Sequence, residues 1–338
     1  MTSPTAGLFF VWRIFQRRTE SLAAEFGLRV NYYYRSWEDR SKFHKACSYV
    51  PKAMGTVKDL ISNRPAVVFI QLPPTPLLYI AAMYCWMTRT KLIADCHNAM
   101  IYSRWLTWPL AKSLLRRTDA VLVHNEDVER YARQYKLKTI VLRDPLPNLP
   151  KTTDRPLLEQ HGLSETAYVI VPWSFAPDEP ISEFIEAVAS LPDVKFVMTW
   201  FAEKLSPELR SKLPPNLILT GYLDNRNFNA IFSQASAALV LTTREGTQPS
   251  AASEAIVLGI PLIVSDLRTT RTLYEEMPIY VDNDAEAIRQ GIIEALAEND
   301  RYKEKITAFQ RTFENRLEAE IRDVKSLLGV SSKDTELR

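Results

Sequence analysis

The loop after the apolar run 238–242 holds the polar side chains with the clearest chemical meaning. It contains Arg244, Glu245, Gly246 and Thr247. A helix is predicted to start near Ser250, because Pro249 precedes it and small hydroxyl residues fill its first turn. The first turn of a helix offers free backbone N–H groups, which bind an anion such as a pyrophosphate. The segment therefore predicts an anion-binding unit or, as the plainer alternative, a routine well-capped strand-turn-helix.

Glu254 lies four residues after Ser250, on the same face of the predicted helix and one turn further along. A carboxylate at that place can accept two hydrogen bonds from the vicinal hydroxyls of a ribose. Gly259-Ile260-Pro261 then ends the helix and restarts the sheet.

A second polar group follows the apolar run 91–95, which ends at Asp95 and is followed by His97 and Asn98. His97 can hydrogen-bond a sugar hydroxyl, while Asp95 can orient that sugar or act as a general base. The alternative is that His97 has a structural role, as a lone histidine at a strand end more often does.

Strands and helices must position these polar groups. Along the sequence, apolar runs of strand length alternate with segments of helix length. Predicted strands of the first half are 7–12, 28–34, 66–70, 91–95, 120–124 and 139–142, with helices such as 15–26, 77–88, 104–117 and 126–135. The second half predicts strands at 168–172, 194–198, 217–220, 237–242, 261–264 and 279–281. Its predicted helices are 180–190, 225–234, 250–258, 284–297 and 301–328. Continuous apolar strands between helices indicate parallel sheets covered on both faces.

The fold class that follows is α/β, with two doubly wound, Rossmann-like domains facing a cleft. The proline-rich stretch 143–156 is typical of a linker between them. We expect one domain over 1–145 and the other over 155–315. The C-terminal helix, about 315–338, is expected to pack back on the first.

Three segments resemble GT-B glycosyltransferases of the family 4 type, and in detail the β-1,4-mannosyltransferases that build lipid-linked oligosaccharides. The segment 238–266 is similar to their donor-binding signature, and 91–103 is similar to a strand ending in Asp-Trp-His-Asn. The turn 174–179, Ser-Phe-Ala-Pro-Asp-Glu, resembles a Ser-Trp-Thr-Pro-Asp-Glu turn. The resemblance implies that the first domain binds the acceptor and the second the nucleotide-sugar donor.

The resemblance also implies roles for individual residues. Glu254 would bind ribose, Glu245 would approach the donor sugar, and His97 would meet the transferred sugar. By the same resemblance Gly246, Thr247 and Ser250 would line the diphosphate, and Ser174 could contact the donor phosphate. Arg244 and Tyr222 are further candidates for donor binding. Asp178 and Glu179 are interpreted as acids that face a helix dipole.

Three departures from the pattern stand beside this resemblance. Eight residues separate Glu245 from Glu254, where the family has seven. The first strand-to-helix turn, 12–18, contains no glycine. The Arg/Lys pair that many enzymes of this fold carry is also missing, and Arg244 is the candidate substitute for that pair.

Basic charge gathers in the first half, where residues 1–145 hold 22 Lys and Arg against 11 Asp and Glu. The remaining residues hold 20 against 29. Either these charges are solvated faces, or the first half meets an anion such as a lipid phosphate. The candidates near the first turn are Arg13, Arg17 and Arg18, which otherwise form an ordinary basic helix start.

Residues 103–117 combine Trp105 and Trp108 with basic side chains. That combination is typical of helices lying in a headgroup layer, although a core-facing helix with a basic outer face explains it as well. The longest apolar run, 77–87, is too short to span a bilayer. Residues 1–13 lack the pattern of a signal peptide.

The three cysteines and four histidines show no metal-type spacing, and no Asp-x-Asp motif is present. We therefore expect no metal and no cofactor. We also expect a cytoplasmic protein that is peripheral on the membrane at most, and no nucleic-acid partner. The expected function is transfer of a hexose from a nucleoside-diphosphate sugar to a lipid-linked or surface-glycan acceptor, retaining or inverting. The alternatives are a catalytically degenerate scaffold or regulatory subunit of the same fold and a nucleotide-sugar epimerase.

Overall fold

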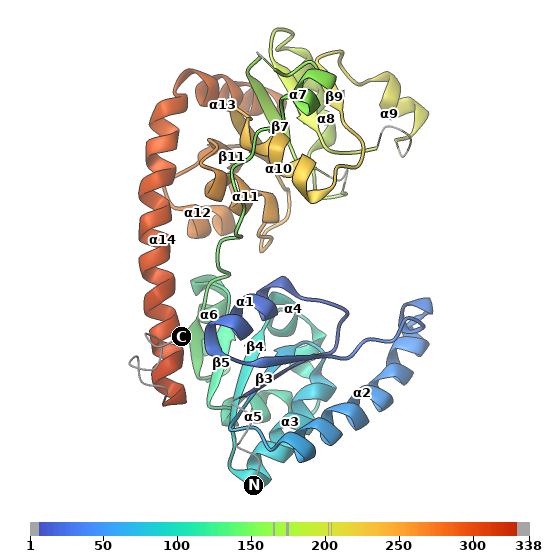
Figure 1. Cartoon of the computed structure of the whole chain (residues 1–338), viewed down its shortest axis with the longest axis vertical. Helices are drawn as coiled ribbons and strands as arrows, with labels where there is room; N and C mark the ends of the chain where they lie inside the picture. The colour runs from blue at the N-terminus through green and yellow to red at the C-terminus, as the bar shows by residue number, and fades with distance from the viewer. Residues whose placement is uncertain (1–6, 165, 174–175, 202, 204, 330–338) are drawn as a thin grey trace. The chain divides into compact units, whose positions relative to one another are not determined.

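The computed structural model describes residues 7–329 except 165, 174, 175, 202 and 204 (Figure 1). The chain divides into two compact units. Unit 1 holds the described residues of 1–145 and 315–338, and unit 2 holds those of 146–314. Each unit is built around one parallel sheet.

The sheet of unit 1 has six strands in the order β2-β1-β3-β4-β5-β6, all parallel. The strands are β1 (Leu8–Val11), β2 (Arg29–Tyr32), β3 (Val67–Leu72), β4 (Lys91–Cys96), β5 (Ala120–Val123) and β6 (Thr139–Val141). Its helices are α1 (Arg17–Phe26), α2 (Lys42–Asn63), α3 (Thr75–Thr88), α4 (Asn98–Ile101), α5 (Ala111–Arg117) and α6 (Glu126–Arg133).

The central strands of unit 1 are mostly apolar and buried because both faces of the sheet are covered. Along β1, Leu8 and Phe10 enter one core while Phe9 and Val11 enter the other. The second of these cores also contains Val324, from the C-terminal part of the long helix α14 (Asn299–Leu328).

The sheet of unit 2 also has six parallel strands, in the order β12-β11-β10-β7-β8-β9. They are β7 (Tyr168–Val171), β8 (Lys195–Met198), β9 (Leu217–Leu219), β10 (Ala237–Val240), β11 (Leu262–Ser265) and β12 (Ile279–Val281). The helices that precede α14 are α7 (Arg155–Gln160), α8 (Ile181–Ala189), α9 (Pro207–Ser211), α10 (Asn225–Ser233), α11 (Ser250–Leu258), α12 (Arg268–Tyr274) and α13 (Ala285–Ala297).

The predicted doubly wound parallel sheets are confirmed in both units, since each strand order reverses direction once. In unit 1 the reversal lies between β1 and β3, and in unit 2 it lies between β7 and β10. Ligands of such sheets bind beyond the carboxyl ends of the strands at this reversal. The loops after these four strands are therefore the first places to look for a site.

The predicted single helix over 104–117 is wrong. A 3₁₀ turn at Arg104–Thr107 and the separate helix α5 take its place. Pro109 and Leu110 lie between the two, and Leu110 has φ 61°, outside the right-handed helical region. The long helix α2 was not among the helices named from the sequence.

Candidate functional site

Polar side chains of unit 1 collect at the carboxyl edge of its sheet. Gln71 lies at the end of β3, Asp95 lies near the end of β4, and His97 follows β4 directly. His124 follows β5, and Asp144 comes after β6. Parallel strands bring their carboxyl ends to one edge, so these five residues from four separate chain segments meet there.

Arg18 connects the chain segments at this edge by ion pairs and hydrogen bonds. It lies in the first turn of α1 and is only 5% exposed. Its Nε donates to Asp95 Oδ1 at 3.0 Å, its Nη1 pairs with Asp144, and its Nη2 donates to the Leu142 carbonyl at 2.9 Å. Burial acts to lower the pKa of Arg18, but the two carboxylates raise it above its ordinary value. Burial likewise opposes ionisation of Asp144, yet Arg18 and His124 hold the pKa of that carboxyl well below its usual range.

His97 lies above this ion pair, with Nε2 3.7 Å from Asp95 Oδ2. The side-chain amides of Gln71 and Gln16 approach the same Nε2 at 2.8 and 3.3 Å. Because an amide nitrogen only donates, Nε2 is the acceptor and the imidazole is neutral. Burial lowers the pKa of His97 to about 4, against the opposing effect of Asp95. The neutral ring is therefore its state at physiological pH.

Three buried polar atoms of this cluster have no hydrogen-bond partner in the described residues: Asp95 Oδ2, Gln71 Oε1 and His124 Nε2. The His124 ring packs edge-on against His97, with 4.6 Å between the ring centroids. Buried polar atoms in folded proteins almost always have a partner, so unpaired ones that gather at a sheet edge indicate a binding site. Their mixture of acceptors and a ring nitrogen suits the hydroxyls of a sugar.

In unit 2 the loops after β7 and β10 are bonded to one another. Thr242 Oγ1 donates to Asp178 Oδ2 at 3.0 Å, and the backbone N–H of Thr243 donates to the Asp178 carbonyl at 2.7 Å. The Thr242 N–H also donates to Ser265 Oγ, whose hydroxyl donates to Asn283. These contacts fix the loop at the point where the strand order reverses. Asp178 therefore binds a neighbouring loop, beyond the dipole role that the sequence suggested.

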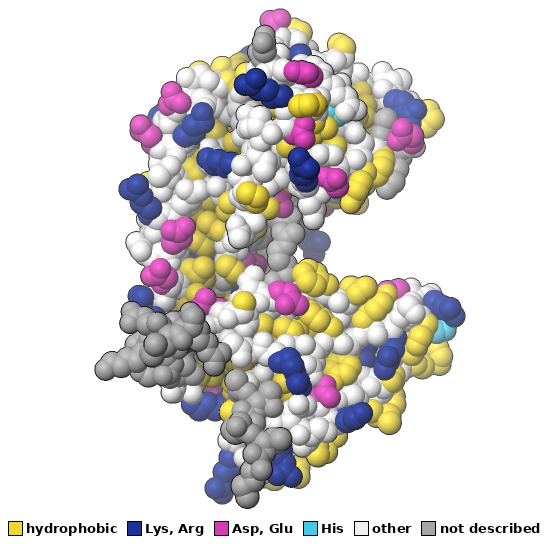
Figure 2. Space-filling view, viewed as in Figure 1, with side chains coloured by type: hydrophobic (Ala, Val, Ile, Leu, Met, Phe, Trp, Pro, Cys, Tyr) yellow, Lys and Arg dark blue, Asp and Glu magenta, His cyan; other side chains and the backbone are white. Residues whose placement is uncertain are grey.

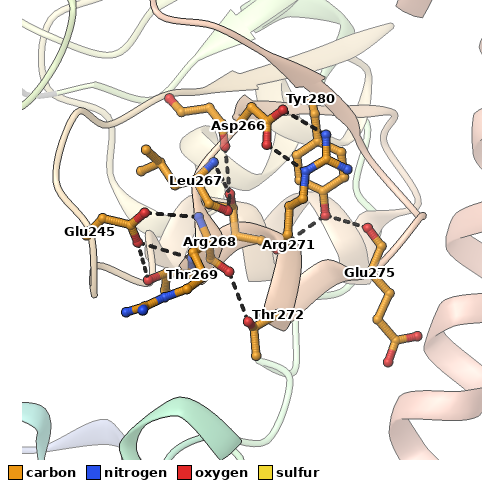
Figure 3. A network of polar contacts seen from close by, with 11 residues as sticks. Glu245, Asp266, Leu267, Arg268, Thr269, Arg271, Thr272, Glu275 and Tyr280 are labelled. Carbon is orange, nitrogen blue, oxygen red and sulfur yellow. Dashed lines mark hydrogen bonds and ion pairs between the residues drawn. The ribbon is translucent and has the colours of Figure 1, made fainter.

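Glu245 binds the start of α12 (Figure 3). Its carboxylate accepts hydrogen bonds from the backbone N–H groups of Arg268 and Thr269, at 3.0 and 3.2 Å, and from the Thr269 hydroxyl at 2.8 Å. Partial burial opposes ionisation, but these three donors lower the pKa of Glu245 below its ordinary value. The carboxylate that was predicted to approach the donor sugar thus caps a helix.

Gly246 follows in a left-handed conformation, with φ 78°, which a residue with a Cβ rarely adopts. Its N–H donates to Thr269 Oγ1 at 2.8 Å, and Thr247 comes next, half-buried. The helix α11 begins at Ser250, which is exposed, and Glu254 lies half-buried one turn into it. The predicted start of this helix at Ser250 is therefore confirmed, and Glu254 lies within the helix.

Arg244 and Tyr222 are both exposed. The backbone N–H of Arg244 donates to Thr242 Oγ1. This bond involves the main chain of Arg244 and not its guanidinium group. The Tyr222 ring stacks on Phe201, with 6.3 Å between centroids. Ser174 lies outside the described residues.

The residues predicted to meet an acceptor or a membrane fall into different environments. Arg13 is exposed, the side chain of Arg17 lies outside the described part of the chain, and Arg18 is buried in its ion pairs. Trp105 and Trp108 are half-buried and stack on one another at 5.2 Å. Arg18 is therefore a positioning residue rather than a surface cation.

Sequence reasoning missed Gln16, Gln71, His124 and Asp144. One signal for His124 was available, because β5 is followed by the dipeptide His124-Asn125 just as β4 is followed by His97-Asn98. The other three carry no local pattern. Among the described residues, no group of three or more His, Cys, Asp or Glu side chains is arranged to hold a metal ion.

The architecture has close counterparts among solved structures. HepE from Anabaena, solved in complex with UDP, superposes with a TM-score of 0.71 at 13% identity, covering 96% of this chain and 100% of that one. A glycosyltransferase from Rickettsia africae gives 0.71 at 13% identity, over 96% and 99%. The chain has the GT-B fold. A UDP-N-acetylglucosamine 2-epimerase also superposes, with a TM-score of 0.59 at 13% identity, over 91% of each chain.

No protein-family model matches the sequence, and no curated protein matches it. At identities this low the superpositions establish the fold, and the activity has to be argued from the site.

Proposed function

We propose that this protein is a glycosyltransferase that moves a hexose from a nucleoside-diphosphate sugar to a lipid-linked or surface-glycan acceptor. The observation that carries the proposal is the loop of unit 2 that runs from Gly246 to Glu254. It lies at the reversal of the strand order, where the left-handed glycine, the open start of α11 and the carboxylate one turn later follow one another. The open first turn of a helix binds a diphosphate, and a carboxylate one turn later can accept hydrogen bonds from a ribose.

In this proposal the backbone N–H groups at Ser250 and its neighbours bind the diphosphate, and Glu254 binds the ribose. Gly246 allows the backbone to approach the diphosphate, because it has no Cβ and no atom of the described residues lies within 4 Å of where one would be. HepE, with the same fold, has been solved with UDP-glucose, which supports a nucleotide-sugar donor.

The cluster of unit 1 supplies the second part of the proposal. His97, held neutral by burial, hydrogen-bonds the transferred sugar. In this proposal Asp95, which is fully buried and bound to Arg18, holds the edge of the sheet next to His97 and does not act as the base. The 22 Lys and Arg of residues 1–145, twice the number of acids there, favour an anionic acceptor such as a lipid pyrophosphate.

The proposed location is the cytoplasm, where thiols stay reduced. Cys47, Cys85 and Cys96 are all free in the structure, in keeping with that location. Within the described residues no helix is long and apolar enough to cross a membrane.

The test is the thermal stability of the purified protein against a panel of nucleoside diphosphates and their sugars, UDP-glucose and GDP-mannose included. A ligand at 100 times its Kd stabilises the folded state by about 2.7 kcal/mol, so a selective donor raises Tm by several degrees. No shift with any member of the panel would contradict the proposal and favour the degenerate scaffold.

A nucleotide-sugar epimerase is the second candidate, because a UDP-N-acetylglucosamine 2-epimerase shares the fold. Incubating the nucleotide sugar without an acceptor distinguishes the two reactions. An epimerase converts the donor sugar with no acceptor present, and proton NMR of the incubated nucleotide sugar reveals a new isomer. A transferase leaves that spectrum unchanged apart from slow hydrolysis.

A further inference from the structure

Helix α2 turns its apolar side outward. Its exposed large hydrophobic residues are Phe43, Val50, Met54, Val57 and Ile61. They are spaced by three, four or seven residues, so they form one stripe along the helix. The buried residues on the opposite side are Ser48, Lys52, Thr56 and Leu60. A surface helix of a globular protein normally has the reverse arrangement.

The polar side of α2 is fixed in the interior by specific bonds. Trp12 Nε1 donates to Thr56 Oγ1 at 3.0 Å, and Lys52 Nζ donates to Glu38 Oε1 at 2.8 Å. Rotating the helix to bury its apolar stripe would break the buried Lys52–Glu38 ion pair and leave charges unpaired. The outward stripe is therefore built into the fold.

Helix α3 packs against α2 and adds apolar side chains near its C-terminal end. Met83, Trp86 and Met87 are all exposed, and Trp86 is 79% exposed. We call these three residues and the α2 stripe the α2–α3 surface. Figure 2 shows hydrophobic side chains gathered where Figure 1 draws these helices. Exposed apolar side chains gathered on two packed helices are typical of an interaction site.

The charge around this surface identifies the partner. Residues 40–91 contain eight Lys or Arg and one acid, Asp59. The Asp59 carboxylate accepts hydrogen bonds from the side chains of Asn31 and Tyr33. Its negative charge is therefore directed at these two residues of unit 1. The exposed cations are Arg40, Lys42, Lys45, Lys58, Arg64 and Arg89. A partner must offer an apolar layer and dense negative charge together.

We propose that the α2–α3 surface docks on an anionic phospholipid bilayer. The apolar side chains enter the boundary between headgroups and acyl chains, and the surrounding cations meet lipid phosphates. A second copy of this chain is a poorer partner, because a two-fold contact through this surface would place like charges against each other. The proposal does not depend on sugar transfer, and it places the contact on α2 and α3 rather than on residues 103–117.

Flotation of the full-length protein with vesicles tests this. We expect binding to equal mixtures of phosphatidylglycerol and phosphatidylcholine, little binding to phosphatidylcholine alone, and release as salt is raised to about 0.5 M. The double variant Met54→Glu/Ile61→Glu should weaken binding at least ~10-fold, since both side chains would have to enter the bilayer boundary. Both positions are more than half exposed, so thermal unfolding should be unchanged.

The matched controls are Leu110→Glu and Ile293→Glu, which add the same charge at exposed apolar positions elsewhere. Both should bind like the wild type. A second variant, Lys45→Ser/Lys58→Ser, removes charge without touching the stripe and should weaken binding ~25-fold, at ~5-fold for each cation.

Three results would overturn the proposal. One is unchanged vesicle binding by both double variants, and another is loss of binding in Leu110→Glu alone. The third is a dimer in size-exclusion chromatography that Met54→Glu/Ile61→Glu dissociates, because the α2–α3 surface would then be covered by a second copy.

Discussion

Arg18 Nε and Asp95 Oδ1 lie 3.0 Å apart in the interior of unit 1, with side-chain exposures of 3% and 0%. The pair joins the helix after β1 to the end of β4, across the reversal of the strand order. Because Arg18 also binds Asp144 and the Leu142 carbonyl, one guanidinium joins α1, the end of β4 and the segment after β6. The position of His97 depends on this arrangement, since it lies next to Asp95.

Replacing Arg18 with alanine should destabilise the protein strongly. The change leaves Asp95 without its ion-pair partner in the interior, and breaking a buried pair typically costs about 3–5 kcal/mol. Urea unfolding measures the free energy of unfolding. The control is Arg13→Ala, an exposed arginine before the same helix, which should change stability by no more than ~0.5 kcal/mol. A loss below ~1 kcal/mol in Arg18→Ala would show that the pair is not structurally important.

Replacing His97 with alanine should lower kcat about 10²–10⁴-fold, while the Kd for the donor nucleotide changes little. The reason is that His97 lies in unit 1 and the proposed nucleotide site lies in unit 2. Steady-state kinetics and calorimetry give the two quantities. His161→Ala, which changes a histidine of unit 2 at the end of α7, is the control. A wild-type rate in His97→Ala would leave His97 with a structural role only.

His97 should titrate near pH 4 in the folded protein, as followed by the NMR shifts of its ring protons. The unfolded chain has the ordinary pKa of about 6.5, so between pH 6.5 and 4 only the unfolded state takes up this proton. Stability should therefore fall as the pH falls through this window, by at most ~1.4 kcal/mol per pH unit from this group. The variant His97→Gln should lack this contribution. A ring that titrates near 6.5 would contradict the neutral, buried histidine.

Replacing Glu254 with alanine should weaken nucleoside-diphosphate binding at least ~100-fold. Two hydrogen bonds between a carboxylate and ribose hydroxyls are worth about 1.5–3 kcal/mol each. Isothermal calorimetry measures the Kd, and the melting temperature shows whether the fold persists. Glu286→Ala, on the exposed side of α13, should bind like the wild type. Unchanged affinity in Glu254→Ala would remove the central residue of the proposed donor site.

Two variants at Glu245 separate a capping role from a catalytic one. Glu245→Ala removes the cap of α12 and should cost about 1 kcal/mol of stability. Glu245→Gln keeps one amide oxygen for the Thr269 and Arg268 donors, and we expect its kcat within ~10-fold of the wild type. A much larger loss of kcat in Glu245→Gln, with Tm unchanged, would show that the carboxylate acts on the substrate.

Local sequence was enough to predict most strands and the loop-helix unit at Gly246 and Ser250. The strands are continuous apolar runs, and the helix start is marked by Pro249 and its end by Gly259, which has φ 70°. Such signals act within a few residues, because they reflect backbone conformation and burial on both faces of a sheet.

Helix α2 shows where that local reasoning fails. Its apolar residues have helical spacing, but they face outward, and the interior side is polar because Trp12 and Glu38 supply partners for Thr56 and Lys52. Partners 14 or more residues away in the sequence decide which side of the helix is buried.

The residues that meet at the edge of unit 1 were decided by tertiary structure alone. Sequence pointed to Asp95 and His97, yet Gln71, His124 and Asp144 join them only because β3, β4, β5 and β6 are neighbours in the sheet. The burial that lowers the pKa of His97 and the pairing of Arg18 arise from the same strand order. Strand order results from long-range packing, and no local pattern in the sequence records it.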